Sequence, residues 1–165
     1  NMAISFDTNH KPVIGEVEQL ENDLVVITAD NASPMTFTGT RTYILGTENL
    51  IVIDPGPDSE AHLSSIMKYI GKRKVTDILL THSHIDHSPL SRQLKIETGA
   101  KIIGFGSADE ARTSFMKKLS SSLDLGGEEG IDKDLVLDKK VIEKQILKLN
   151  NYSFEVVYRL EYLIF

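Results

Sequence analysis

The feature that most constrains the fold is a cluster of three histidines and one aspartate within six residues: His82, His84, Asp86 and His87. On an α-helix His84 would project about 200° away from His82, and on a β-strand His87 would leave the face shared by the other three. The apolar run before the cluster, 75–80, is typical of a buried strand. Ser88 and Pro89 after it are typical of the N-cap and first residue of a helix. The cluster must therefore lie on a loop that curls between a strand and a helix.

The residue types of this cluster point to metal binding. Neutral imidazoles and carboxylate oxygens are ligands of Zn²⁺, Mn²⁺ and Fe. In a layer of alternating strands and helices, ligands usually bind at the C-terminal ends of the strands, where this loop begins. A polar turn with chance histidines is the alternative, but burying histidines and a carboxylate without partners would be costly.

Short β-branched runs and turns alternate through the first part of the chain. Such runs, which predict strands, occupy 13–20, 24–28, 42–45 and 50–53. Strands this close in sequence usually pair antiparallel. The segment 29–40 is rich in Asn, Ser, Thr, Pro and Gly and predicts a long loop.

Past residue 54 the hydrophobic period becomes that of a helix. The apolar residues that share one helical face are Leu63, Ile66, Met67 and Ile70. Asp58 or Ser59 would cap its start and Gly71 would end it. With strands at 75–80 and 101–105, the order strand, helix, strand, helix, strand follows an antiparallel beginning. This pattern predicts an α/β (α+β) fold in which helices cover a mixed sheet.

The composition is that of one soluble globular domain over residues 1–165, with 41% hydrophobic residues. A helix is expected over 109–123 and a flexible, turn-rich connection over about 120–134. Beyond it, 146–149 and 152–158 flank a turn dipeptide and predict a hairpin. A single helix over 139–149 fits the same residues.

Charge and cysteine content exclude several classes of function. The net charge is −6, from 18 basic and 24 acidic residues, which argues against a protein that chiefly holds nucleic-acid backbone. The chain has no cysteine, so thiol mechanisms and disulfides are excluded, and a reducing, cytoplasmic location is expected. It has no apolar run long enough for a signal peptide or a membrane span, so we expect no membrane association.

The sequence THSHIDH at 81–87 resembles the H-x-H-x-D-H signature of the metallo-β-lactamase superfamily. Asp54, in the run IVIDPGPD, agrees with an aspartate that family members carry at the end of an earlier strand. The segment 31–46 resembles the substrate-side loop of the subgroup of glyoxalase II-like hydrolases and β-lactamase-like protein 2 endoribonucleases. The resemblance runs from about 13 to 158. It implies a four-layer αββα sandwich with a dinuclear metal cleft at one edge.

The resemblance also implies roles for the clustered residues. His82 and His84 would hold one metal ion, and Asp86 and His87 the second. Asp86 would also orient the attacking water as the catalytic residue, and Asp54 would accept a hydrogen bond that fixes the loop. Zinc is the expected metal, with manganese or iron as alternatives. Two adjacent divalent cations lower the pKa of a water between them, which permits hydrolysis of an ester, thioester, lactam or phosphodiester.

Later family elements are absent from this sequence. Family members carry a further histidine in a T-P-G-H-T turn, a bridging aspartate and a last histidine, whereas this chain has no histidine after His87. We therefore expect a C-terminally truncated, N-terminal half of the sandwich with an incomplete metal site. The two other histidines, His10 and His62, lie upstream, and His62 is expected on the protein surface.

The sequence leaves more than one function open. A metal-dependent hydrolase of a small ester, thioester or lactam is the first hypothesis, and RNA cleavage rests on analogy alone. The alternative is an inactive remnant that serves as a structural or self-associating module. Its motivation is the apolar terminus at 156–165, which would form a homodimer through an exposed strand or be buried as a central strand of a monomer.

Overall fold

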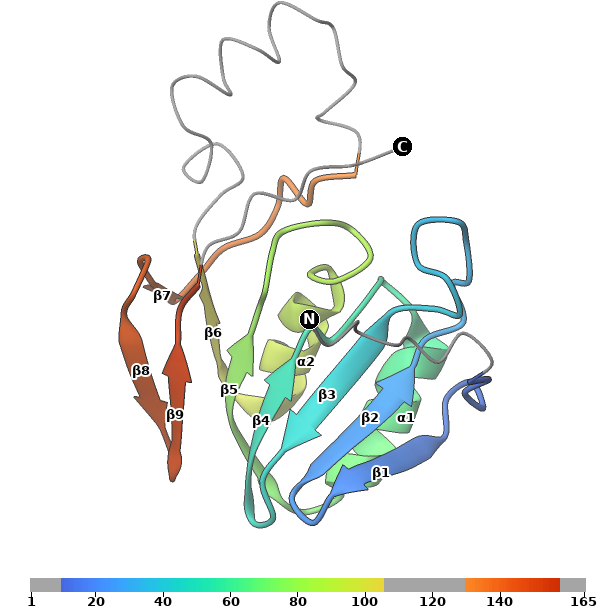
Figure 1. The fold of residues 1–165 in the computed structure, drawn as a ribbon, viewed down its shortest axis with the longest axis horizontal. Helices are drawn as coiled ribbons and strands as arrows, with labels where there is room; N and C mark the ends of the chain where they lie inside the picture. The colour runs from blue at the N-terminus through green and yellow to red at the C-terminus, as the bar shows by residue number, and fades with distance from the viewer. Residues whose placement is uncertain (1–9, 106–129, 158–165) are drawn as a thin grey trace, which may run out of the picture.

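The computed structural model describes residues 10–105 and 130–157. Within them, seven strands form one mixed sheet in the order β1-β2-β3-β4-β5-β6-β7, and two further strands form a hairpin (Figure 1). The sheet strands are β1 (Val17–Glu21), β2 (Leu24–Thr28), β3 (Arg41–Leu45), β4 (Asn49–Ile53), β5 (Lys74–Leu79), β6 (Lys101–Gly104) and β7 (Lys139–Lys140). The hairpin strands are β8 (Ile146–Leu149) and β9 (Tyr152–Glu155), and the helices are α1 (Glu60–Ile70) and α2 (Leu90–Thr98).

The first four strands pair antiparallel, as their close spacing predicts. Val26 lies opposite Tyr43 and Ile44 opposite Val52. The strand expected over 13–20 begins only at Val17, because a turn with Gly15 at a φ of 73° precedes it. The long loop at 29–40 is confirmed between β2 and β3.

Strands β4 to β7 pair parallel, and the two helices connect β4 to β5 and β5 to β6. Figure 1 shows both helices behind the sheet, on one face, so the predicted mixed sheet with helices on its outer face is confirmed. Helix α1 is capped by Ser59 and ends at Gly71. The prediction that Ser88 caps α2 is wrong: Pro89 precedes this helix, and the Ser88 hydroxyl donates its single proton to Asp132 instead, with the carbonyl of His84 also within 3.1 Å.

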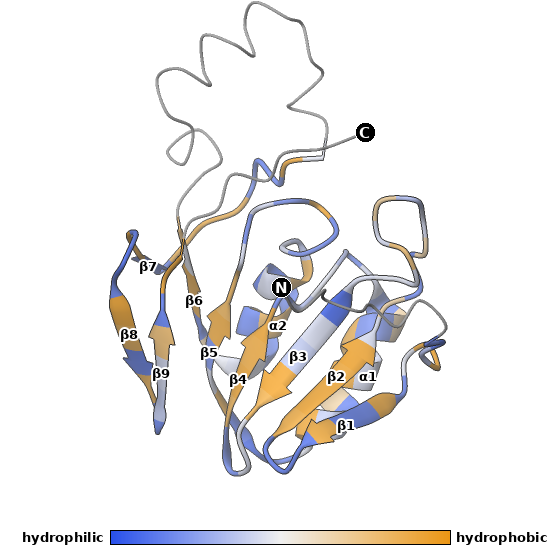
Figure 2. Cartoon of the chain, viewed as in Figure 1, coloured by the Kyte–Doolittle hydropathy of each residue, from blue (hydrophilic) through white to orange (hydrophobic). Residues whose placement is uncertain are grey.

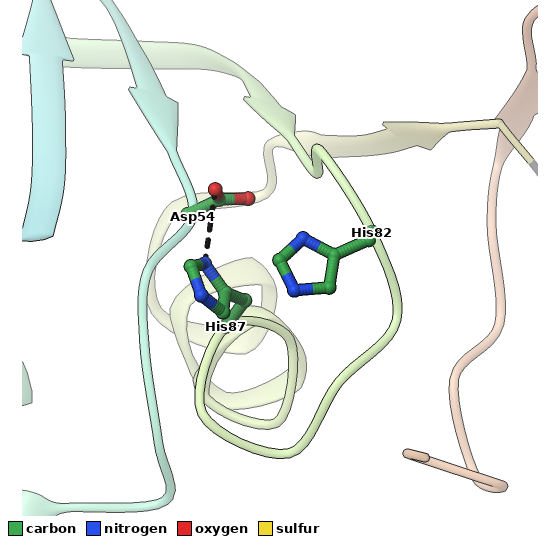
Figure 3. A group of neighbouring side chains, drawn as sticks. All are labelled: Asp54, His82 and His87. Atoms are coloured by element: carbon green, nitrogen blue, oxygen red, sulfur yellow. Dashed lines mark hydrogen bonds and ion pairs between the residues drawn. The ribbon is translucent and has the colours of Figure 1, made fainter. Parts of the chain in front are cut away.

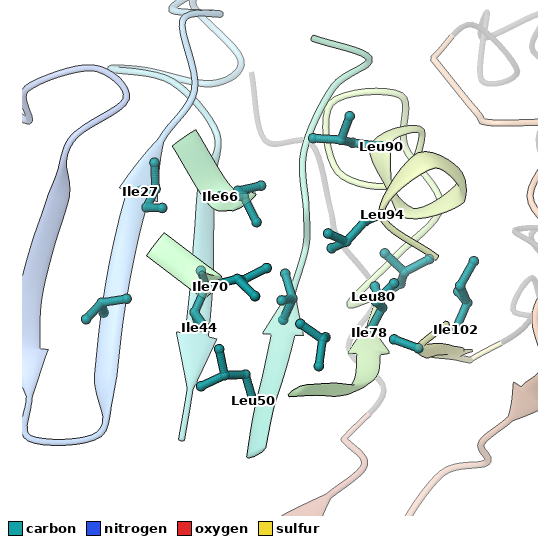
Figure 4. Close-up of a cluster of buried hydrophobic side chains, with 14 residues drawn as sticks. Ile27, Ile44, Leu50, Ile66, Ile70, Ile78, Leu80, Leu90, Leu94 and Ile102 are labelled. Carbon is teal, nitrogen blue, oxygen red and sulfur yellow. The ribbon is translucent and has the colours of Figure 1, made fainter. Parts of the chain in front are cut away.

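The main core lies between the sheet and the helices (Figure 4). Ile66 and Ile70 of α1, with Leu90 and Leu94 of α2, pack against sheet residues such as Ile78. All five side chains are buried. Figure 2 shows that hydrophobic residues predominate on β2 and β4, whereas the loop after β5 is mostly hydrophilic. The core therefore holds the parallel strands rigidly beneath that loop.

A second layer begins on the opposite face of the sheet. Ile102 belongs to the helix-side core, whereas the next residue, Ile103, packs with Leu147 of β8 and Phe154 of β9. Successive strand residues point to opposite faces, so the hairpin lies across the sheet from the helices. The predicted hairpin is confirmed, and the alternative helix over 139–149 is wrong. The fold is thus a partial αββα arrangement.

Some predictions fall outside the described residues. These are the helix at 109–123, most of the connection at 120–134, and the end of the apolar terminus beyond residue 157. Among the residues that are described, no helix has the length and apolar character needed to cross a membrane.

Replacing Ser59 with alanine is expected to lower the free energy of unfolding by about 1 kcal/mol, the usual cost of losing an N-cap. The Ser59 hydroxyl accepts a hydrogen bond from the backbone N–H of His62 at 3.3 Å. Ser64→Ala, at an exposed position of the same helix, is the matched control and should cost nothing because alanine favours helices. Urea unfolding measures both variants, and equal losses would contradict the capping role.

Candidate metal centre

Two loops meet at the C-terminal edge of the parallel strands. Asp54 directly follows β4, and the loop 81–88 follows β5, its parallel neighbour. The Asp54 N–H donates to the carbonyl of Leu79 at 2.9 Å and extends the pairing of the two strands. Asp54 itself has a φ of 49°, which turns the chain away from the sheet. The two loops are therefore held side by side where the sheet ends.

The Asp54 carboxylate organises this edge, although it is only 5% exposed. Its Oδ1 accepts a hydrogen bond from the Thr81 N–H at 2.8 Å. Its Oδ2 accepts one from the Thr81 hydroxyl at 2.6 Å and lies 3.1 Å from His87 Nδ1. Figure 3 shows the His87 ring between Asp54 and the loop, with the His82 ring directed toward it. One buried carboxylate thus orients both ends of the loop.

The direction of these hydrogen bonds sets the proton positions on two imidazoles. The single hydroxyl proton of Thr81 goes to Asp54, so Thr81 Oγ1 accepts from His82 Nδ1, which lies 2.8 Å away. Asp54 accepts from His87 Nδ1 in the same way. In the neutral form of His82, Nε2 then carries the lone pair that a metal ion needs, whereas His87 Nε2 lies 3.3 Å from the Asp86 carboxylate. The donor set therefore fits a divalent cation.

The curl of the loop comes from its own backbone. The carbonyl of His84 accepts from the N–H groups of His87 and Ser88, both at 3.0 Å. The N–H of Gly56 donates to the His87 carbonyl at 2.9 Å, which ties the turn after β4 to the loop. These bonds bring residues of the cluster together although no helix or strand periodicity would do so.

The structure brings the predicted residues together in two overlapping groups. The potential ligand atoms of His82, His84 and Asp86 lie within 4.8 Å of one another, and so do those of Asp54, His82 and His87. Asp86 and His87 are also neighbours, with Oδ2 3.3 Å from Nε2. The ring centroids of His82 and His87 are 4.1 Å apart. The division of these residues between two metal ions stays a prediction.

The predicted surface position of His62 is wrong. It is not on the surface but only 2% exposed, and its Nε2 lies 2.8 Å from the Thr42 hydroxyl. That hydroxyl donates to the carbonyl of Asp54 at 2.8 Å, so it accepts from His62. Burial lowers the pKa of His62 to about 4. A signal was present in the sequence, because His62, Ile66 and Ile70 recur every four residues on the buried face of α1.

Thr81 and His10 lie at and away from the metal-binding cluster, respectively. Thr81, which links Asp54 to His82, was not singled out from the sequence, although it stands next to the cluster. His10, by contrast, lies 3.1 Å from Glu18 beside the first strand, apart from the two groups of potential ligands.

Comparison with known proteins agrees with this fold and shows the family of the chain. The sequence family described as the metallo-beta-lactamase superfamily matches residues 35–159, so the chain belongs to the metallo-beta-lactamase superfamily. Hydroxyacylglutathione hydrolase GloC of Haemophilus influenzae is 29% identical over 111 residues, which are 67% of this chain and 50% of that protein. An atrochrysone carboxyl ACP thioesterase of Aspergillus terreus is 34% identical over 88 residues, covering 52% of this chain and 28% of the thioesterase.

The solved structures share the fold. A subclass B3 metallo-beta-lactamase of Bradyrhizobium japonicum superposes with a TM-score of 0.61 at 21% identity, covering 89% of this chain and 52% of that one. The chain thus matches about half of that structure and of GloC, and a smaller share of the thioesterase.

Proposed function

We propose that this chain is a metal-dependent hydrolase whose loop 81–87 holds up to two divalent cations. The proposed ligands are His82, His84, Asp86 and His87, with Asp54 as the carboxylate behind them. The observation that carries the proposal is the convergence of His82, His84 and Asp86, whose potential ligand atoms lie within 4.8 Å of one another, with His82 Nδ1 held by Thr81. Zinc accepts such nitrogen and oxygen donors, and manganese or iron can replace it.

A bound divalent cation would lower the pKa of a water molecule and polarise a substrate carbonyl. The chain's own residues would position the reaction. Asp86, partly exposed beside His87, is the proposed catalytic residue, with its carboxylate accepting a hydrogen bond from the attacking water. Asp54 and Thr81 would keep the imidazole rings in place throughout.

A small-molecule thioester or ester is the proposed substrate class. The names of two relatives, a hydroxyacylglutathione hydrolase and an ACP thioesterase, support this choice. The net charge of −6 disfavours RNA, whose backbone would be repelled. Lactams remain the other small-molecule candidate, as a solved relative is a metallo-beta-lactamase.

Metal titration followed by a substrate panel tests the proposal. The chain, freed of metal with a chelator, should bind about one or two equivalents of Zn²⁺ or Mn²⁺ in competition with a chromophoric chelator. The double variant His82→Ala, His84→Ala should lose at least the ion assigned to these two histidines, whereas His10→Ala, a histidine outside the loop, should bind as the wild type does. Failure of the wild type to bind either metal would refute the proposed site.

The zinc-loaded chain should then hydrolyse a glutathione thioester in preference to a chromogenic β-lactam or a single-stranded RNA. The double histidine variant must lose this activity for it to be credited to the site. Hydrolysis of RNA alone would overturn the assigned substrate class, and hydrolysis of none of the three would count against activity of this chain.

A further inference from the structure

A segment far along the chain, residues 130–132, lies against the loop 81–88, the metal loop. The N–H of Ile85 donates to the carbonyl of Gly130 at 2.8 Å, and the N–H of Asp132 donates to the carbonyl of Ser83 at 2.8 Å. Between these bonds His84 and Ile131 form an antiparallel bridge. The backbone on both sides of His84 is therefore fixed by residues 130–132, although His84 itself is exposed.

The Asp132 side chain adds a second attachment to the loop. It is only 8% exposed, and its Oδ2 accepts a hydrogen bond from the Ser88 hydroxyl at 2.9 Å. The Arg92 guanidinium on the first turn of α2 donates to both carboxylate oxygens, at 2.8 and 2.6 Å. Ser88 follows His87 directly. One carboxylate thus joins the end of the metal loop, the following helix and the segment 130–132.

We propose that Asp132 is a positioning residue that latches the segment 130–132 onto the metal loop and fixes the backbone of residues 83–88 for ligand binding. It touches neither substrate nor the proposed ligand atoms, and it acts through Ser88, Arg92 and the paired backbone. The part of this proposal that concerns metal affinity rests on the proposed function.

The negative charge of Asp132 is essential to this role. A buried carboxylate is costly unless it is paired and hydrogen-bonded, and Arg92 and Ser88 together satisfy it. Asparagine has nearly the same shape but keeps one acceptor oxygen and presents an N–H₂ group on the other side. Arg92 Nη1 donates to both carboxylate oxygens, so in either orientation the N–H₂ group would face this donor, and the attachment to α2 would open. The Ser88 hydroxyl could still accept from that group, because it can donate to the carbonyl of His84.

Asp138 offers a matched control on the same two elements. It accepts a hydrogen bond from Lys95 of α2 at 2.5 Å and from the backbone N–H of Ile102 at 2.8 Å. Like Asp132, it joins the segment after residue 130 to a basic side chain of α2, about one helical turn further along. Its other contact is with β6 rather than with the metal loop. Asp138→Asn should therefore lose a more exposed ion pair with the same helix without disturbing the loop.

Amide hydrogen exchange of the full chain without metal tests the latch directly. In Asp132→Asn, the amides of Ile85 and His87, which donate to the carbonyls of Gly130 and His84, should exchange about tenfold faster than in the wild type, because their local opening becomes easier. In Asp138→Asn these two amides should be unchanged, while that of Ile102 should exchange faster. If Ile85 and His87 are unaffected in Asp132→Asn, or equally affected in both variants, the proposal is overturned. Should Asp132→Asn fail to fold, Ser88→Ala must produce the same localised change, and its absence overturns the proposal as well.

Zinc affinity separates this proposal from the proposed function. The dissociation constant should rise about tenfold in Asp132→Asn, the usual effect of losing a residue that orients the ligands, and stay within about twofold in Asp138→Asn. Equal zinc dissociation constants for the wild type and Asp132→Asn would overturn the proposal that Asp132 positions the loop for metal binding. If the wild type binds no zinc, the proposed function fails, and the exchange result alone decides whether Asp132 positions the loop.

Discussion

Replacing Asp54 with asparagine is expected to weaken zinc binding by about a hundredfold while the chain still folds. The asparagine oxygen can still accept from the Thr81 N–H, but its N–H₂ group then faces the Thr81 hydroxyl and His87 Nδ1. His87 must accept at Nδ1 and carry its proton on Nε2. The Thr81 hydroxyl, no longer donating to a carboxylate, turns its proton to His82 Nδ1. Both rings then present a proton where the cation needs a lone pair.

Zinc competition with a chromophoric chelator measures this effect, and ring-nitrogen chemical shifts of the metal-free chain report the tautomers. Asp23→Asn is the matched control, because Asp23 also accepts a short hydrogen bond, 2.6 Å from the Tyr152 hydroxyl, but before β2 at the other end of the sheet (Figure 1). It should bind zinc as the wild type does. Unfolding by urea should show a loss of about 1–3 kcal/mol for Asp54→Asn, from the disturbed buried hydrogen bonds. Unchanged tautomers with full zinc affinity would show that Asp54 does not set the proton positions.

The parts of the fold that the sequence predicted correctly are those with a strong local period. The helix at Leu63 to Ile70 has an apolar face, a capping serine and a terminal glycine, and all three are observed. The cluster at 82–87 predicted a curled loop because neither the helical nor the strand period places its members together. In both cases the signal lies within about ten consecutive residues.

The contacts that were missed join residues distant in the chain. Ser88 has the right neighbours for an N-cap, but a partner 44 residues away takes its hydroxyl proton. Nothing in the sequence near Asp132 indicates that contact. The proton positions on His82 and His87 also depend on Asp54, which lies 27 residues before Thr81 and 33 before His87. Local sequence patterns predict which residue types can bind a metal ion. The orientation of those side chains depends on contacts with distant residues, which only the three-dimensional structure shows.

The hairpin after residue 145 shows why propensity alone was insufficient there. The residues from 139 to 149 fit helical spacing and strand alternation equally well. The structure favours the strand because Leu147 and Phe154 both pack on Ile103 at the far face of the sheet. The turn at Asn150, with a φ of 51°, uses a residue type that tolerates this conformation. Burial against a distant strand therefore favours the hairpin over the helix, and the local sequence from 139 to 149 carries no information about that contact.

His62, which lies on α1 and outside the metal loop, makes the stability of the fold sensitive to acid. It is buried and donates from Nε2 to Thr42, and its Nδ1 has no hydrogen-bond partner among the described residues. A proton on Nδ1 would therefore be buried without an acceptor, which is why burial holds the pKa of His62 at about 4 rather than 6.5. The unfolded chain binds that proton more readily than the folded one between these two pH values. The contribution of neutral His62 to stability is thus complete above about pH 6.5 and is lost as the pH falls toward 4.

His62→Gln should remove this acid sensitivity, because the glutamine amide can donate to Thr42 and does not titrate. A pKa of about 4 in the folded chain against 6.5 in the unfolded chain corresponds to about 3 kcal/mol of stability lost by the wild type between neutral pH and pH 4. The carboxylates lose stability in acid in both proteins, so the difference between the two curves isolates His62. Urea unfolding at a series of pH values should show the wild type falling more steeply than His62→Gln by this amount. His10→Gln, which changes the partly exposed histidine beside Glu18, should keep the steeper wild-type slope. Parallel curves for the wild type and His62→Gln would mean that His62 accepts a proton without cost, and that its Nδ1 meets an acceptor or water when the chain is acidified.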